Sequence, residues 1–398
     1  MLWYSANGVH APTRSTTILT ISVLMSWSAA VNAQSVEGAA NPEPETRSRK
    51  PSWTSEKFLE AEPLPLPRAS KDKSTPPPEN QTRHAAPPGK ESQKSDGHMP
   101  SEATKAGADS STRLFPAAEL AKLQSRSSRN AVVIPQDTGA LKVPFSSSQV
   151  LPDGARLSYP YNVVGKIFFE NPADGKPYIC SGSVINRRLI LTAGHCVHEG
   201  SGGVKGYHTN IIFVPAYNKG SAPYGVWTYS WVITTRSWAT GGGSVPNAAD
   251  LAIIEVRDNN DKAGRPYAIG DAVGWLGYRT NGLVDNHTKK IGYPAGFDGG
   301  EVMHQVDSQS FYMDSDNTVL YGSDMTGGSS GGPWIENFGY QSEGQSGGLQ
   351  PWPNRVVGVT SYGPSDPGPS YQGSSVLGDE FIAIMKAACQ HRAGNCSQ

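Results

Sequence analysis

Short runs of strand-forming residues, separated by turn residues, dominate the chain from residue 143 to its end. Runs such as YNVVGKIFF, RLILTA, WTYSWVITT, LAIIEV and RVVGVTSYG are bounded by Gly, Pro, Asn and Asp. Many short strands at close spacing, with no long helical pattern between them, predict an all-β sandwich or barrel. About 250 residues is a comfortable size for a pair of barrels. The expected globular domain therefore covers residues 143–398.

One helical pattern stands out near the C-terminus, at about residues 376–390. Apolar residues recur there at positions i, i+3, i+4 and i+7: Phe381, Ile384, Met385 and Ala388.

The residues before 143 have a different composition. Arg14 precedes an apolar run, ILTISVLMSW, and then small residues that end at Ala33. This order predicts a secretory signal peptide over residues 1–33, because so short an apolar run cannot span a bilayer. Residues 34–142 are rich in Pro, Ser, Lys and Glu, and we expect them to be disordered, as a pro-segment or linker.

The charges of the whole chain are balanced, with 34 Lys and Arg against 35 Asp and Glu and a formal net charge of −1. This balance gives no reason to expect a nucleic-acid or membrane partner. We expect a monomer that is secreted, either extracellular or periplasmic, and that uses no cofactor or metal.

Four cysteines lie in the globular part: Cys180, Cys196, Cys389 and Cys396. An even number in an exported chain predicts two disulfides, for which three pairings exist and the pairing of neighbours is the most economical. Potential metal ligands also crowd together at residues 195–198, HCVH. They lack the paired spacing of a structural zinc site.

The motif TGGSSGGPW at residues 326–334 contains two serines, Ser329 and Ser330, and each is the centre of a Gly-x-Ser-x-Gly pattern. In an α/β-hydrolase the serine lies on a sharp turn from a strand into a helix, and Asp and His follow it in the chain. The residues after Trp334 do not predict such a helix, and the only histidine downstream is His391, close to the C-terminus. The order His, Asp, Ser fits better. His195 follows an apolar run, and Asp250 opens another, where its carboxylate could orient the imidazole.

Several stretches together resemble the chymotrypsin-like (trypsin-like) serine peptidases: CSGSVINRRLILTAGHC, DLAIIEV, KKIGYPAGF, DMTGGSSGGPW and VVGVTSYGP. The IGYP stretch favours the bacterial branch that contains the glutamyl endopeptidases. The resemblance implies two antiparallel six-stranded barrels, at about residues 159–258 and 266–378, with the active site between them and a helix outside. It also implies a Cys180–Cys196 bridge.

The same resemblance assigns the catalytic roles to His195, Asp250 and Ser330. The nucleophile is then the serine directly before Gly-Gly-Pro, and the backbone N–H groups of Gly328 and Ser330 form the oxyanion hole. Ser329 is a bystander. Trypsin-type enzymes have an Asp at that place, which pairs with a newly formed N-terminus, so we do not expect activation by that route.

Substrate preference is less constrained by these motifs. Asp324 lies six residues before Ser330, where trypsin-type enzymes bind Arg or Lys. Met325 and Thr360 replace the Thr and His usual in the glutamyl branch, so specificity for Glu is not expected. We leave the preferred residue open, with a lean toward basic side chains. The substrate backbone is expected to pair with three consecutive residues: Ser361, Tyr362 and Gly363.

These observations predict a secreted serine endopeptidase that acts on protein or peptide substrates through an acyl-enzyme. Two alternatives stay open. One is a catalytically silent protein with a protease fold that binds a partner, and the other is an esterase-like serine hydrolase.

Overall fold

The computed structural model describes residues 36–42, 53–69, 92–100, 109, 111–120, 144–314, 318–339, 352–364 and 370–396. The predicted signal peptide, residues 1–33, lies outside them. Within the described part of the chain, no helix is long and apolar enough to cross a membrane.

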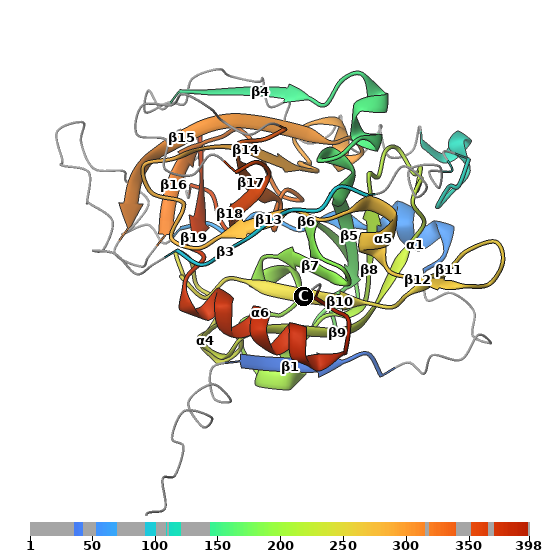
Figure 1. Ribbon diagram of the computed structural model, residues 1–398, viewed down its shortest axis with the longest axis horizontal. Helices are drawn as coiled ribbons and strands as arrows, with labels where there is room; N and C mark the ends of the chain where they lie inside the picture. The colour runs from blue at the N-terminus through green and yellow to red at the C-terminus, as the bar shows by residue number, and fades with distance from the viewer. Residues whose placement is uncertain are drawn as a thin grey trace, which may run out of the picture.

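Six antiparallel strands close into a first barrel, drawn in green to yellow in Figure 1. The order around the ring is β5, β6, β7, β10, β9 and β8, and β8 pairs with β5 to complete it. The bounds are Val164–Glu170 (β5), Pro177–Asn186 (β6), Leu189–Thr192 (β7), Thr209–Pro215 (β8), Trp227–Thr235 (β9) and Ala252–Val256 (β10). A small hairpin, β11 (Asn259–Asn260) with β12 (Pro266–Tyr267), follows the barrel.

The central strands of this barrel have apolar runs without alternation, and the structure explains why. Every residue of β7 and of β10 is buried, so protein covers both faces of these strands. The catalytic candidates His195 and Asp250 adjoin their ends, because His195 follows β7 and Asp250 precedes β10. Two fully buried strands therefore position the turns that carry these two side chains.

A second sheet contains the strands of the C-terminal barrel, in the order β19, β16, β15, β14, β17, β18 and β13. Val359, at the end of β18, donates its N–H to the Ser374 hydroxyl of β19. The predicted all-β class with two barrels is confirmed. The bounds are Gly277–Arg279 (β13), His287–Gly292 (β14), His304–Asp314 (β15), Thr318–Gly322 (β16), Pro333–Glu336 (β17), Arg355–Val359 (β18) and Tyr371–Ser375 (β19).

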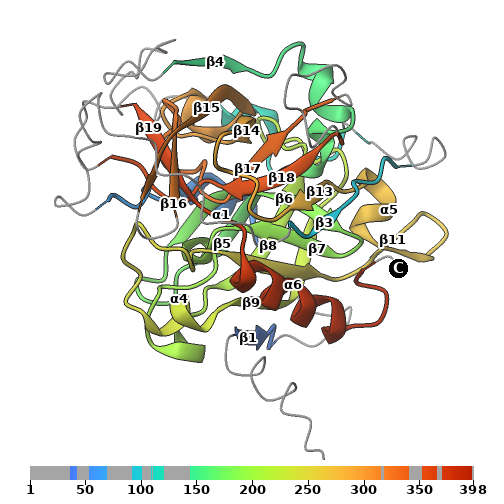
Figure 2. The same cartoon turned by 60° about the vertical axis from the view of Figure 1, so that its left-hand side comes forward.

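Three short or medium helices accompany the barrels: α4 (Arg236–Thr240), α5 (Ile269–Val273) and α6 (Asp379–His391). Helix α6 is the predicted C-terminal helix, and the four residues expected to face the core are the four that are buried. It lies against β9 and β10 on the outside of the first barrel, as both ribbon views show (Figure 2).

Parts of residues 34–142 are ordered, so the expectation of disorder is wrong for the described pieces of this segment. Several of their few apolar residues are buried against the barrels, a gain that composition alone does not reveal. Phe115, for example, is 2% exposed. The ordered elements are β1 (Val36–Ala40, paired with β9), α1 (Ser55–Glu60), β2 (Glu62–Pro63, paired with β6) and β3 (Lys94–Ser95, paired with β13).

The globular domain was expected to begin at residue 143, and this boundary remains our proposal. Strand β4 (Phe145–Gln149) pairs with β15 directly after it, and Figure 1 shows β4 along the outer edge of the second sheet.

A buried ion pair joins the first barrel to the segment that leads into β15. Lys166 of β5 donates from Nζ to Glu301 Oε1 at 2.7 Å, and the two side chains are 2% and 7% exposed. The Tyr217 hydroxyl donates to the other Glu301 oxygen.

Candidate active site

His195 sits in a tight turn directly after β7. A Cβ at Gly194 would lie 2.9 Å from the Trp238 ring and 3.0 Å from Asp250 Oδ1, so the turn has room only for glycine there. The next residue, Cys196, is bonded to Cys180 of β6 with an S–S distance of 2.11 Å. The expected bridge is present, and it fixes the turn to the neighbouring strand.

The Asp250 carboxylate is fully buried and accepts three hydrogen bonds. Oδ1 accepts the His195 backbone N–H at 2.8 Å, and Oδ2 lies 2.9 Å from His195 Nδ1. Oδ2 also accepts the hydroxyl of Ser361 at 2.5 Å. Because a carboxylate only accepts, the proton of a neutral His195 ring belongs on Nδ1. Nε2 is then left as a basic nitrogen.

Ser330 lies in the turn between β16 and β17, and backbone hydrogen bonds attach this turn to the first barrel and to Thr360 after β18. Its carbonyl accepts the Ser181 N–H at 2.7 Å, and the next residue, Gly331, donates its N–H to Thr360 at 2.8 Å. Gly331 has a φ of +76°, and a Cβ on it would lie 1.9 Å from Thr192 Oγ1, so this close approach to β7 requires glycine.

The structure therefore places Ser330 beside both the histidine turn and the residues next to Ser361. The atoms that would exchange a proton are Ser330 Oγ and His195 Nε2. Both are buried, and neither has a hydrogen-bond partner within the described ranges. A serine hydroxyl and an imidazole nitrogen in this condition are not engaged by other groups, which is what a proton transfer between them would require.

The adjacent Ser329 has a different environment. Its hydroxyl donates to the Thr326 carbonyl at 2.7 Å and accepts from Gln372 Nε2 at 3.0 Å. Both ends of this hydroxyl are occupied by structural bonds, so Ser329 is a part of the turn.

Gly328 was expected to donate to the oxyanion. Its φ is +87°, a conformation that favours glycine. Its N–H is directed to a carbonyl oxygen, that of Leu64, at 3.1 Å. Leu64 belongs to residues 34–142, the N-terminal segment. The sequence did not suggest a contact between this segment and Gly328.

Asp324 is 8% exposed, and its carboxylate acts electrostatically on a buried lysine. Lys290 of β14 is fully buried and donates from Nζ to the Gly322 carbonyl at 2.6 Å, over the Trp334 ring at 4.5 Å. Burial lowers the pKa of Lys290 well below its usual value, and the charge of Asp324 opposes that shift. The carboxylate of Asp324 therefore favours the charged form of Lys290, which burial disfavours.

The other predicted substrate-binding residues line up after β18. Thr360 accepts from the Trp334 indole N–H at 2.9 Å, so its hydroxyl is engaged within the barrel. Tyr362 is buried and its hydroxyl lies 3.0 Å from Thr318 Oγ1. Gly363 offers backbone groups only, and these bond to the N-terminal segment.

The second disulfide joins Cys389 and Cys396, with an S–S distance of 2.04 Å. Among the described residues, Cys180, His195 and Cys196 have donor atoms within 4.8 Å of one another. Both sulfurs are in the disulfide, so this group offers a metal only one ligand.

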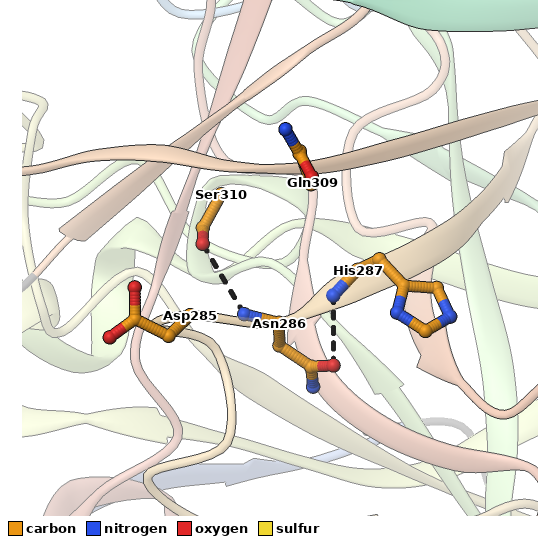
Figure 3. Close-up of a pocket in the computed structure, with 5 residues that line it drawn as sticks. All are labelled: Asp285, Asn286, His287, Gln309 and Ser310. Atoms are coloured by element: carbon orange, nitrogen blue, oxygen red, sulfur yellow. Dashed lines mark hydrogen bonds between the residues drawn. The ribbon is translucent and has the colours of Figure 1, made fainter. Parts of the chain in front are cut away.

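A hollow at the start of β14, shown in Figure 3, is lined by none of the site residues above. Ser310 Oγ accepts the Asn286 N–H at 3.3 Å and Asn286 Oδ1 accepts the His287 N–H at 2.8 Å, so local hydrogen bonds engage part of its polar lining. The lining residues are Asp285, Asn286, His287, Gln309 and Ser310.

Two features of the site were missed from the sequence. One is the side chain of Ser361, which was expected to contribute only to the strand that pairs with substrate and also bonds Asp250. The other is Lys290 behind Asp324. Lys290 lies in the strand sequence HTKKIG, which does not reveal that this lysine is buried, and its neighbour lies far along the chain.

A two-barrel fold with a His–Asp pair and a serine turn at their junction defines a protein of the chymotrypsin-like class. The family model described as Trypsin matches residues 155–376, more than half of the 398-residue chain. The chain belongs to this family.

Two curated relatives are similar over about half of the chain. The extracellular metalloprotease of Bacillus subtilis is 27% identical over 186 residues, which are 46% of this chain and 53% of that protein. The glutamyl endopeptidase of Bacillus licheniformis is 26% identical over 203 residues, 49% of this chain and 57% of that protein. This second match agrees with the predicted branch. The chain thus spans little more than half the length of either relative.

Among solved structures, the protease Anisep from Arthrobacter nicotinovorans is 32% identical, covering 57% of this chain and 94% of its own, with a TM-score of 0.46. A Glu endopeptidase in complex with MPD is 21% identical, covering 64% of this chain and 99% of its own, with a TM-score of 0.47.

Proposed function

We propose that this protein is a secreted serine endopeptidase that uses His195, Asp250 and Ser330. One observation carries the proposal: the buried Asp250 carboxylate binds both the backbone and the ring of His195, which leaves Nε2 free to act as a base. The names of the two curated relatives, a glutamyl endopeptidase and an extracellular metalloprotease, support peptide-bond hydrolysis outside the cell.

In the proposed reaction, Ser330 Oγ forms a bond to the scissile carbonyl carbon while His195 Nε2 takes the hydroxyl proton. Asp250 stabilises the imidazolium and keeps the ring oriented. The oxyanion is held by the N–H groups of Gly328 and Ser330. Nε2 then gives its proton to the leaving amine as the C–N bond breaks. Water then forms a bond to the acyl carbon while Nε2 takes its proton, and Nε2 returns this proton to Ser330 Oγ as the ester bond breaks.

The proposed selectivity depends on Asp324, and Lys290 changes what should be expected of it. An isolated buried carboxylate would bind Arg or Lys and reject Glu. The charge of Asp324 also acts on the buried Lys290, where it favours the ammonium form, so part of that attraction is used internally. We therefore propose only a moderate preference for basic residues before the scissile bond.

A peptide-library profile of wild type and of Asp324→Ser tests this proposal. The variant should lose activity on basic substrates and keep it on apolar ones. An even loss on all substrates, or a loss of stability, would instead assign Asp324 to the charge balance of Lys290. A wild type that cuts after Glu only would contradict the proposal.

The triad is tested by comparing two neighbouring serines. Ser330→Ala should remove nearly all hydrolysis, by about 10⁶-fold, because it removes the nucleophile. Ser329→Ala is the matched control and should retain most activity. A fluorophosphonate should label wild type and Ser329→Ala at Ser330. Absence of labelling in every form would favour the silent binding protein, and cleavage of short esters without cleavage of casein would favour the esterase.

A further inference from the structure

We propose that the chain inhibits itself with residues 62–69, EPLPLPRA, which occupy the substrate cleft in the direction opposite to a substrate. This proposal rests on the proposed function, because it identifies the cleft by the serine endopeptidase residues. The proposed occupant of the cleft is this proline-rich segment of the protein itself.

The segment takes the hydrogen-bonding groups that a substrate needs. The Leu64 carbonyl accepts the N–H of Gly328, the proposed oxyanion donor, at 3.1 Å. The Pro67 carbonyl accepts the N–H of Gly363 at 2.9 Å, and the Ala69 N–H donates to the Gly363 carbonyl at 3.1 Å. Both ends of the proposed substrate-binding surface are therefore occupied at once.

The fit is close at the two glycines on this surface. A Cβ at Gly327 would lie 2.6 Å from the Leu64 oxygen. A Cβ at Gly363 would lie 2.7 Å from a methyl group of Leu66. The occupant thus makes van der Waals contact along the same path as its hydrogen bonds.

The direction of the segment follows from these contacts. Residues 67–69 bond to Gly363 as a parallel bridge, while Leu64, earlier in the chain, lies at Gly328. In the proposed function the residues before the scissile bond pair with residues 361–363, so a substrate runs from Gly363 toward Ser330. The segment runs from Gly328 toward Gly363. The peptide bonds of the segment therefore run opposite to those of a substrate. On the side of Gly363, where a substrate has the acyl part of its scissile bond, the segment has the amine part of its Leu64–Pro65 bond.

The segment is anchored on both sides of the cleft. Before it, Phe58 of α1 stacks on Trp53 with ring centroids 5.0 Å apart and meets Phe168 of the first barrel edge-on at 5.1 Å. At the cleft, β2 pairs with β6, and the Leu64 N–H donates to the Ile179 carbonyl at 3.0 Å. Ala69 is 3% exposed. Anchors at both ends give the segment a high effective concentration in the cleft.

Two substitutions in the full chain should release the segment. Leu64→Asp with Leu66→Asp replaces two partly buried leucines by charges, which favour water over the cleft. Hydrolysis of a peptide substrate should rise about 10- to 100-fold. In the wild type, only the fraction of molecules whose cleft is free of the segment can bind substrate. Leu151→Asp is the matched control, because Leu151 is 64% exposed and outside the segment. It should hydrolyse at the wild-type rate.

Adding a synthetic peptide of residues 62–69 to the double variant should inhibit it again, and the same peptide with both leucines replaced by Asp should not. Equal hydrolysis by wild type and the double variant, with Ser330→Ala inactive, would overturn the proposal while leaving the proposed function intact.

Amide hydrogen exchange gives a readout that needs no activity. The amides of Gly328, Gly363 and Ala69 should be protected in wild type and in Ser330→Ala, and should exchange faster in the double variant. Rapid exchange at these amides in wild type would overturn the occupied cleft whatever the enzyme assays show. If these amides are protected in wild type and no variant hydrolyses a peptide, the occupied cleft is supported and only the proposed function is rejected.

Discussion

The buried pair of Lys166 and Glu301 allows a quantitative test of what holds the first barrel to the rest of the domain. The two charged groups are 2.7 Å apart and almost inaccessible to water. Burial lowers the pKa of Lys166, and the charge of Glu301 opposes that shift. Glu301→Gln removes the compensating charge with little change in shape, so the ammonium group stays buried beside a neutral amide.

Removing one partner of a buried ion pair costs about 3–5 kcal/mol, because the remaining charge is desolvated without compensation. The N–H of Lys219 also donates to the Glu301 carbonyl at 2.8 Å, so the backbone holds the site in place and little relaxation is expected. For a domain of this size, that loss corresponds to a fall in Tm of roughly 6–20 °C.

Urea denaturation of wild type, Glu301→Gln, Lys166→Met and the double variant measures the coupling between the two side chains. The double variant should be more stable than Glu301→Gln alone, because it buries no unpaired charge. Arg265→Gln, which breaks the exposed pair of Arg265 with Asp261, is the control and should have no measurable effect. A loss below about 1 kcal/mol in Glu301→Gln, or strict additivity in the double variant, would refute this reasoning.

Three further changes test the site and its surroundings. Asp250→Asn should lower kcat by about 10⁴-fold with the fold intact, because an amide favours the wrong imidazole tautomer. Ser361→Ala should lower kcat by about 10- to 100-fold with KM unchanged, since it removes one charged hydrogen bond worth about 1.5–3 kcal/mol. His208→Gln should reduce the acid sensitivity of folding. Burial lowers the pKa of His208 from 6.5 to about 3, so the unfolded state binds the proton first. Stability then falls as pH drops below 6.5, by about 2 kcal/mol at pH 5.

Each of these expectations has a result that would contradict it. For Asp250→Asn that result is a near-normal kcat, and for Ser361→Ala it is a change in KM alone. For His208→Gln it is an unfolding free energy that varies with pH between 8 and 5 as steeply as in wild type. Circular dichroism of each variant at pH 8 controls for misfolding.

The local features of the domain were predictable because neighbouring residues determine them. The strand runs, the apolar face of α6 and the order His195, Asp250, Ser330 are properties of short stretches, and periodicity or motif reveals such properties. The pairing of the cysteines could not be deduced from spacing, and came from the family resemblance.

Contacts between distant residues were decided by the tertiary structure alone. Ser361 bonds Asp250 across 111 positions, and Lys166 pairs with Glu301 across 135. No local pattern reports such a distance, because either partner would have the same neighbours in sequence if the other were absent.

The N-terminal segment shows the same division most clearly. Its sequence determined that it could not fold by itself, since Trp53, Phe58 and Leu64 are too few and too scattered to form a core. Whether it is ordered depends on the surface it meets. The barrels provide an aromatic partner for α1 and backbone groups of β6 and Gly363 that pair with the segment, and the free energy that orders residues 53–69 comes from burial against them.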